Sequence, residues 1–126
     1  MQRPPPLVAV IDDEPSVLTA LRLLLEMQGY RVIAGESEAP VIEHLASGGE
    51  PPAAIIADYR LRAGRTGIQA IGDIRRRLGY AVPGLIVTGD TTSAWLGDAH
   101  ALHLTVLQKP VLPRQLAAAI DQSMAQ

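Results

Sequence analysis

The chain has 126 residues, a length that suits one globular domain with a core of its own. Its formal net charge of −2 gives no overall basic field, which argues against direct binding to nucleic acid or to an anionic membrane. The absence of cysteine excludes disulfides and zinc–thiolate sites, and the absence of phenylalanine predicts an aliphatic core.

The first six residues, MQRPPP, lack the apolar core of a signal peptide, and no later apolar run approaches membrane-spanning length. We therefore expect a cytoplasmic domain that makes no membrane contact. The prolines at positions 4–6 favour an extended lead-in, which fits either an interdomain linker or a trimmed terminus. The folded domain is expected to span residues 7–126.

Short aliphatic runs alternate with segments of helical periodicity in the first half of the chain. Aliphatic runs without polar residues predict strands buried on both faces, and glycines are suited to ending the helices between them. In chain order we expect a strand at Leu7–Ile11, a helix from Pro15 to Gly29, a strand at 31–34, and a helix at 38–46 with Ser37 as its N-cap.

The same alternation continues through the second half. In chain order we expect a strand at 53–57 with Asp58 just after it, a helix opened by Thr66 or Gly67 and closed by Gly79, a strand at 85–87 ending at Thr88, a weakly amphipathic helix at 91–102, a strand at 104–107 and a helix at 112–124. Strands and helices that alternate in this way predict an α/β fold, with a parallel sheet covered by helices on both faces.

Polar side chains follow the predicted strands at their carboxyl ends, where ligands bind in open α/β sheets. Asp12 and Asp13 follow the first strand, Asp58 the third, Thr88 the fourth and Lys109 the fifth. Carboxylates that bind Mg²⁺, a carboxylate nucleophile, and hydroxyl and ammonium groups that offset oxyanion charge are the components of phosphoryl transfer. The sequence thus predicts metal-assisted phosphoryl chemistry at this edge.

Four motifs carry a resemblance to a known family: IDDE at 11–14, IIADYRL at 55–61, VTGD at 87–90 and LQKP at 107–110. With these motifs in this order, residues 7–124 resemble the receiver domains of two-component response regulators. The resemblance implies a flavodoxin-like (βα)5 doubly wound sandwich, with a parallel five-stranded sheet of order 2-1-3-4-5.

The resemblance also implies a role for each acidic residue of the site. Asp58 is expected to be the phosphoacceptor. Asp12 and Asp13 are expected to hold Mg²⁺ together with Asp58 and the backbone carbonyl of Arg60. Glu14 is expected only to begin the first helix, where its charge interacts favourably with the helix dipole.

Further roles follow for the ends of the fourth and fifth strands. Lys109 is expected to contact a phosphoryl oxygen, and Thr88 to move toward the phosphoryl group as the switch hydroxyl. The peptide bond before Pro110 is expected to be cis, as it is in the family.

The chain departs from the commonest receivers at several positions. Val106 stands where many receivers carry an aromatic residue that moves with the switch threonine, so that coupling cannot be assumed here. Trp95 is expected near the fourth helix, either for a partner or to cap the core. Arg60 and Asp90 are hypothesised to pair across the mouth of the site and slow hydrolysis. The loop YRLRAGRTG and the motif LQKPV resemble those of receivers at the C-terminus of hybrid histidine kinases.

The function expected from these features is a phosphorelay receiver, with a histidine kinase phosphodonor domain or a histidine phosphotransfer protein as partner. Such a domain catalyses only its own phosphorylation and dephosphorylation, and its parent protein is then a hybrid histidine kinase. A second copy of the chain is a further possible partner, in a homodimer. A stand-alone single-domain regulator, a fragment of a longer regulator and a receiver-like interaction module that takes no phosphate remain alternatives. A haloacid-dehalogenase-type phosphatase is disfavoured, because it needs Asp-x-Asp where this chain has Glu14, and because the chain lacks room for a cap.

Overall fold

The computed structural model describes residues 4–89 and 95–125, in which five strands alternate with five α-helices. The elements are β1 (Leu7–Ile11), α1 (Pro15–Met27), β2 (Arg31–Gly35), α2 (Ala39–Ala46), β3 (Ala54–Asp58), the 3-10 turn η1 (Arg62–Gly64), α3 (Gly67–Leu78), β4 (Gly84–Thr88), α4 (Trp95–Ala101), β5 (Leu104–Gln108) and α5 (Pro113–Ala125).

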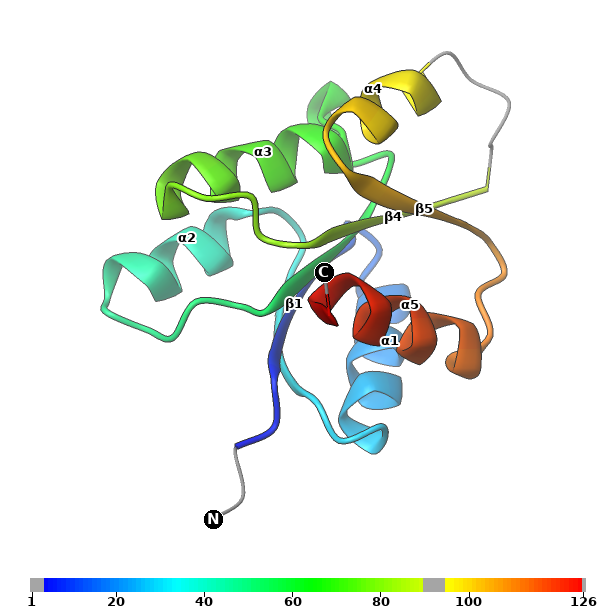
Figure 1. Ribbon diagram of the computed structural model, residues 1–126, viewed down its shortest axis with the longest axis horizontal. Coiled ribbons are helices and arrows are strands. Elements are labelled where there is room, and N and C mark those ends of the chain that lie inside the picture. The colour runs from blue at the N-terminus through cyan, green and yellow to red at the C-terminus, as the bar shows by residue number, and fades with distance from the viewer. Residues whose placement is uncertain (1–3, 90–94, 126) are drawn as a thin grey trace.

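The five strands form one parallel sheet of order β2-β1-β3-β4-β5, which confirms the predicted topology. Helices α1 and α5 cover one face of the sheet, and α2, α3 and α4 cover the other (Figure 1). The chain reverses its direction of winding at β1, so β1 and β3 are neighbours although α1, β2 and α2 separate them in sequence. Their carboxyl ends consequently lie side by side.

The core consists of two aliphatic clusters, one on each face of the sheet. Alternate residues of a strand point to opposite faces, so Ala9 and Ile11 pack toward α2, α3 and α4, whereas Val8 and Val10 pack toward α1 and α5. Burial of β1 on both faces explains why its sequence is an unbroken apolar run. Among the described residues, no helix is both long enough and apolar enough to cross a membrane.

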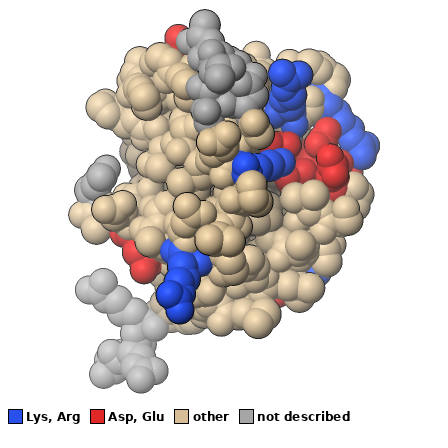
Figure 2. Space-filling model, turned by 90° about the vertical axis from the view of Figure 1, so that its right-hand side faces the viewer, with Lys and Arg blue, Asp and Glu red and all other residues tan. Residues whose placement is uncertain are grey.

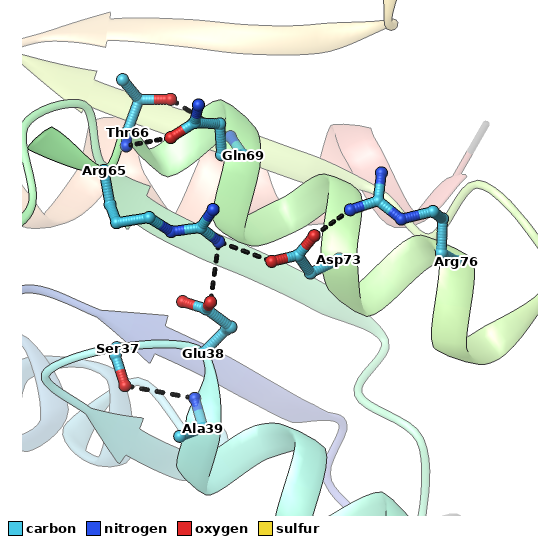
Figure 3. Close-up of polar contacts among 8 residues, drawn as sticks. All are labelled: Ser37, Glu38, Ala39, Arg65, Thr66, Gln69, Asp73 and Arg76. Carbon is cyan, nitrogen blue, oxygen red and sulfur yellow. Dashed lines mark hydrogen bonds and ion pairs between the residues drawn. The ribbon is translucent and has the colours of Figure 1, made fainter.

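Most predicted elements agree with the structure to within about two residues, and a few ends differ. Thr66 is the N-cap of α3, where it forms a capping box with Gln69 (Figure 3). The residue before α2 is Glu38, although the hydroxyl of Ser37 still accepts a hydrogen bond from the Ala39 N–H group. Asp58 was expected just after the third strand. It is instead the last residue of β3, because it still pairs with Val87 of β4.

The helix expected at 91–102 is described only in part. Helix α4 covers Trp95–Ala101, and positions 91–94 lie outside the described residues.

Candidate functional site

Three carboxylates meet at the carboxyl edge of the sheet. Asp12 follows β1, Asp13 is next to it, and Asp58 ends the neighbouring strand β3. One oxygen from each of these side chains lies within 4.8 Å of the others. The N–H group of Asp12 donates to the Gly35 carbonyl at 3.1 Å, which fixes the backbone that carries the first two acids.

Asp12 is the most deeply placed acid of the three, with only 2% of its surface exposed. Burial is the largest cause that raises the pKa of its carboxyl, and the negative charge of Asp58 raises it further. A hydrogen bond from the Glu14 N–H group, 2.9 Å from Oδ1, acts in the opposite direction, as does the charge of Lys109. The net effect is a raised pKa, so the folded chain holds this carboxylate charged at a cost.

A cation and a hydroxyl group complete the site. Lys109 Nζ lies 3.2 Å from Asp58 Oδ1. The backbone N–H of Lys109 donates to the Thr88 carbonyl at 2.7 Å, so the chain is joined between the ends of β4 and β5 where both side chains emerge. Thr88 is buried, and the Lys109–Pro110 peptide bond is cis, as the resemblance implies.

These side chains surround an open pocket of about 460 Å³. Its lining residues are Asp13, Glu14, Asp58, Arg60, Leu61, Thr88, Gly89 and Lys109. All six predicted site residues are therefore brought together, with Asp12 lying beneath the pocket. Acidic atoms gather at one place on this face, with basic atoms around them (Figure 2). The hypothesised partner of Arg60, Asp90, lies outside the described residues.

The loop after Asp58 is folded back against the site. Arg60 and Thr66 form an antiparallel bridge, and the Gly67 N–H group donates to the Tyr59 carbonyl at 2.8 Å. A side chain at position 67 would collide with the Asp58 carbonyl oxygen, so the close approach of α3 to the end of β3 requires glycine. From this loop, Arg62 donates to the Asp13 carbonyl at 3.1 Å and thereby connects two site loops.

A group of ion pairs between α2 and α3 was not predicted from the sequence. Arg65 lies 2.7 Å from Glu38 and 2.5 Å from Asp73, and Arg76 also contacts Asp73 (Figure 3). We name these four residues the arginine network. It contains two acids and two guanidinium groups, so its formal charges balance.

An aromatic stack next to the site was also missed. The rings of Tyr59 and Trp95 are stacked, with centroids 4.1 Å apart and an interplanar angle of 13°. The chain has only one tryptophan and three tyrosines, and Tyr59 directly follows Asp58. The scarcity of aromatic residues was the available signal, because an aromatic residue beside the site in an otherwise aliphatic chain points to a specific ring contact.

The residues at the carboxyl edge fit a divalent cation. We name Asp12, Asp13, Asp58 and Lys109 the acidic site; its three carboxylates and one ammonium carry two net negative charges when all are ionised. One Mg²⁺ ion balances that charge, and carboxylate oxygens are the ligands that it prefers. The donor set thus suits Mg²⁺, and it contains none of the sulfur or imidazole ligands typical of zinc.

Comparisons with known proteins agree with this geometry. The family model described as "Response regulator receiver domain" matches residues 8–121. The chain is 36% identical over 88 residues, 70% of its length, to the transcriptional regulatory protein KdpE of Mycobacterium tuberculosis. It is 26% identical over 117 residues, 93% of its length, to the phyllosphere-induced regulator PhyR of Methylorubrum extorquens.

Solved structures give the same likeness. The crystal structure of a response regulator receiver protein from Sinorhizobium medicae WSM419 superposes with a TM-score of 0.80 at 25% identity, covering 96% of this chain and 95% of the other. The matched regions make up only 37% of KdpE and 43% of PhyR. This chain therefore corresponds to less than half the length of each of these curated relatives.

Proposed function

The chain belongs to the response regulator receiver domain family, and from this premise we propose that Asp58 accepts a phosphoryl group from a phosphohistidine in a Mg²⁺-dependent reaction. Receiver domains take phosphoryl groups from histidine kinases or histidine phosphotransfer proteins, and they generally bind Mg²⁺ at an acidic pocket. The observation that carries the proposal is the convergence of three carboxylates and one ammonium, of which Asp13, Asp58 and Lys109 line a single pocket.

In the proposed reaction, a carboxylate oxygen of Asp58 attacks phosphorus. The new P–O bond forms as the P–N bond to the donor histidine breaks, and the electron pair of that bond stays on the imidazole, which takes up a proton. Asp58 is suited to this role because it is partly exposed to the pocket, whereas Asp12 is buried beneath it.

The neighbouring residues hold and stabilise the reacting groups. Asp12, Asp13 and Asp58, with the Arg60 carbonyl, would hold Mg²⁺, which when bound supplies positive charge to the phosphoryl oxygens. Lys109 already contacts an oxygen of Asp58, and on phosphorylation its ammonium pairs with a phosphoryl oxygen instead. The Thr88 hydroxyl donates to another phosphoryl oxygen, and its movement toward that oxygen begins the change of conformation.

We further propose that residues 7–126 form the receiver unit and that it is the C-terminal receiver of a hybrid histidine kinase. The loop YRLRAGRTG and the motif LQKPV support this context. A stand-alone single-domain regulator is the alternative, and identification of the segments that flank the chain in its parent protein would distinguish the two.

Intact-mass measurement tests the chemistry directly. The protein is incubated with Mg²⁺ and acetyl phosphate, with Asp58→Asn as a control that keeps the size of the side chain. We expect one phosphoryl adduct on the wild type, and none on the variant or with Mg²⁺ chelated. If the wild type forms no adduct and also fails to bind beryllofluoride, the proposal is wrong and the alternative of an interaction module is favoured.

A further inference from the structure

The stack between Tyr59 and Trp95 joins the proposed phosphoacceptor to α4. Tyr59 is bonded to Asp58 along the chain, and Trp95 is the first residue of α4. Their parallel rings, with centroids 4.1 Å apart, are both half-buried and pack against the same core cluster. Aromatic rings in such contact have a preferred mutual geometry, so displacement of one ring disfavours the original position of the other.

Tyr59 is the fixed member of this pair. Its N–H group donates to the Val87 carbonyl at 3.0 Å, and its carbonyl accepts from the Gly67 N–H group at 2.8 Å. The backbone on either side of its ring is therefore tied to β4 and to the start of α3. A change in the backbone at Asp58 is passed directly to the position of the Tyr59 ring.

Helix α4 is held less firmly. It has seven residues, and among its described residues Ala99 is the buried one. Trp95 supplies the large apolar side chain that packs α4 against the core. The other apolar side chains that α4 turns away from solvent are the buried Ala99 and the half-buried Leu96, and neither is aromatic, so the stack with Tyr59 is the contact that orients the start of α4.

Strand β5 has no aromatic side chain that could connect the surroundings of Asp58 to α4. Val106 packs against the same core cluster as the stack, but it is aliphatic and short. The described part of the chain thus contains one aromatic contact between the surroundings of Asp58 and α4.

We infer that the Tyr59–Trp95 stack transmits the phosphorylation state of Asp58 to α4, so that the surface of α4 is the one that changes between the two states. This inference rests on the proposed function and names the residues through which the site acts. A claim of coupling requires an element with two arrangements that the site can bias, and the inference assigns that role to this stack.

The test uses the single tryptophan and hydrogen exchange together. Wild type, Tyr59→Leu, Tyr59→Phe and the control Tyr80→Leu, whose tyrosine is 53% exposed, are each treated with Mg²⁺ and acetyl phosphate. In every sample the adduct is quantified by intact mass, Trp95 emission is recorded, and hydrogen exchange is measured in peptides covering 95–101. The hydrogen-exchange measurement is needed because loss of the Tyr59 ring alters Trp95 emission directly, so emission alone cannot report on α4 in Tyr59→Leu.

We expect phosphorylation to change both Trp95 emission and exchange at 95–101 in the wild type, in Tyr59→Phe and in Tyr80→Leu. In Tyr59→Leu the adduct should form, whereas the exchange response of 95–101 should be lost. A phosphorylated wild type with unchanged exchange at 95–101 overturns the inference alone, as does a full response in Tyr59→Leu. A wild type that forms no adduct and also fails to bind beryllofluoride instead overturns the proposed function, and the inference with it.

Discussion

Two groups of charged side chains on this protein differ in how their charges are balanced. The arginine network has two acids and two guanidinium groups on the α2–α3 side, and its ion pairs run in a chain from Glu38 through Arg65 and Asp73 to Arg76 (Figure 3). The acidic site has three carboxylates for one ammonium, and one of those carboxylates is almost fully buried. Both groups connect segments that are distant in sequence, so this property does not distinguish the arginine network from the acidic site.

The difference in balance separates a structural role from a functional one. Charges that neutralise each other near the surface contribute a modest stabilisation, and they need no further ligand. Like charges crowded at a buried strand end cost stability, and a protein retains them where a bound cation or a reaction requires them. Mg²⁺ should therefore stabilise the protein through the acidic site and not through the arginine network. Substitutions that remove a charge should raise the stability of the metal-free protein at the acidic site and lower it at the arginine network.

The largest expected effect is that of Mg²⁺ on the free energy of unfolding. A ligand that binds only the folded state at about 100 times its Kd stabilises by about 2.7 kcal/mol. We expect an increase of this order for the wild type and for Arg65→Ala, because the arginine network is already neutral. Urea unfolding with Mg²⁺ or with a chelator measures it, and a shift that depended on Arg65 would contradict the comparison.

Asp12→Asn should weaken Mg²⁺ binding and stabilise the metal-free protein. Even residues that only support metal ligands contribute about 10-fold to affinity, so loss of a ligand should cost at least ~10-fold, measurable by calorimetry. The pKa of Asp12 is higher in the folded state than in the unfolded state. At pH values between these two pKa values, the folded state therefore binds more protons than the unfolded state. Stability therefore falls as pH rises through that window, and the wild type carries the penalty at neutral pH.

Thermal unfolding of Asp12→Asn without Mg²⁺ tests the predicted gain in stability of the metal-free protein. We expect a higher Tm than the wild type at pH 7, with the difference shrinking as the pH falls below the raised pKa of Asp12. Equal Tm values at pH 7 would show that the burial of this charge is already compensated in the free protein.

Arg65→Ala should have the opposite effect on stability. The change leaves Glu38 and Asp73 near each other without the shared guanidinium, and Arg65 is 38% exposed, so the loss is expected to be about 1 kcal/mol. Urea unfolding should show a lower midpoint at an unchanged slope. In a double-mutant cycle with Glu38→Gln, additive effects would mean that the pair does not interact.

Arg76→Ala should have the smallest effect. Its side chain is 75% exposed and its contact with Asp73 is an i,i+3 pair on one helix, so the expected loss is below about 0.5 kcal/mol. A loss as large as that of Arg65→Ala would show that Arg76 is needed to hold Asp73 in place for Arg65.

The fold and the position of the site were predictable because both follow from local patterns. Unbroken apolar runs such as residues 54–57 indicate buried strands, and parallel strands necessarily bring the polar residues at their ends, such as Asp58 and Lys109, to one edge. The resemblance then supplied the strand order, which periodicity does not determine.

The arginine network and the Tyr59–Trp95 stack could not be predicted in the same way. Each depends on which side chains of different elements come within a few ångströms of each other. Arg65 and Glu38 are 27 positions apart, and neither residue carries a local sign of its partner. Ser37 illustrates the same limit at short range, because a suitable cap residue does not fix the residue at which the helix begins.

Lys109 is the only lysine in this sequence, and its ammonium lies beside Asp58. Reagents that attach dyes, biotin or solid supports to amines can therefore react within the chain only at this residue or at an N-terminal amine. A kinase-binding assay in which the protein is immobilised through lysine would therefore block the residue that we propose contacts a phosphoryl oxygen. Conversely, a nitrogen-15 label on lysine side chains would place one signal in this chain, located where the chemistry is proposed to occur.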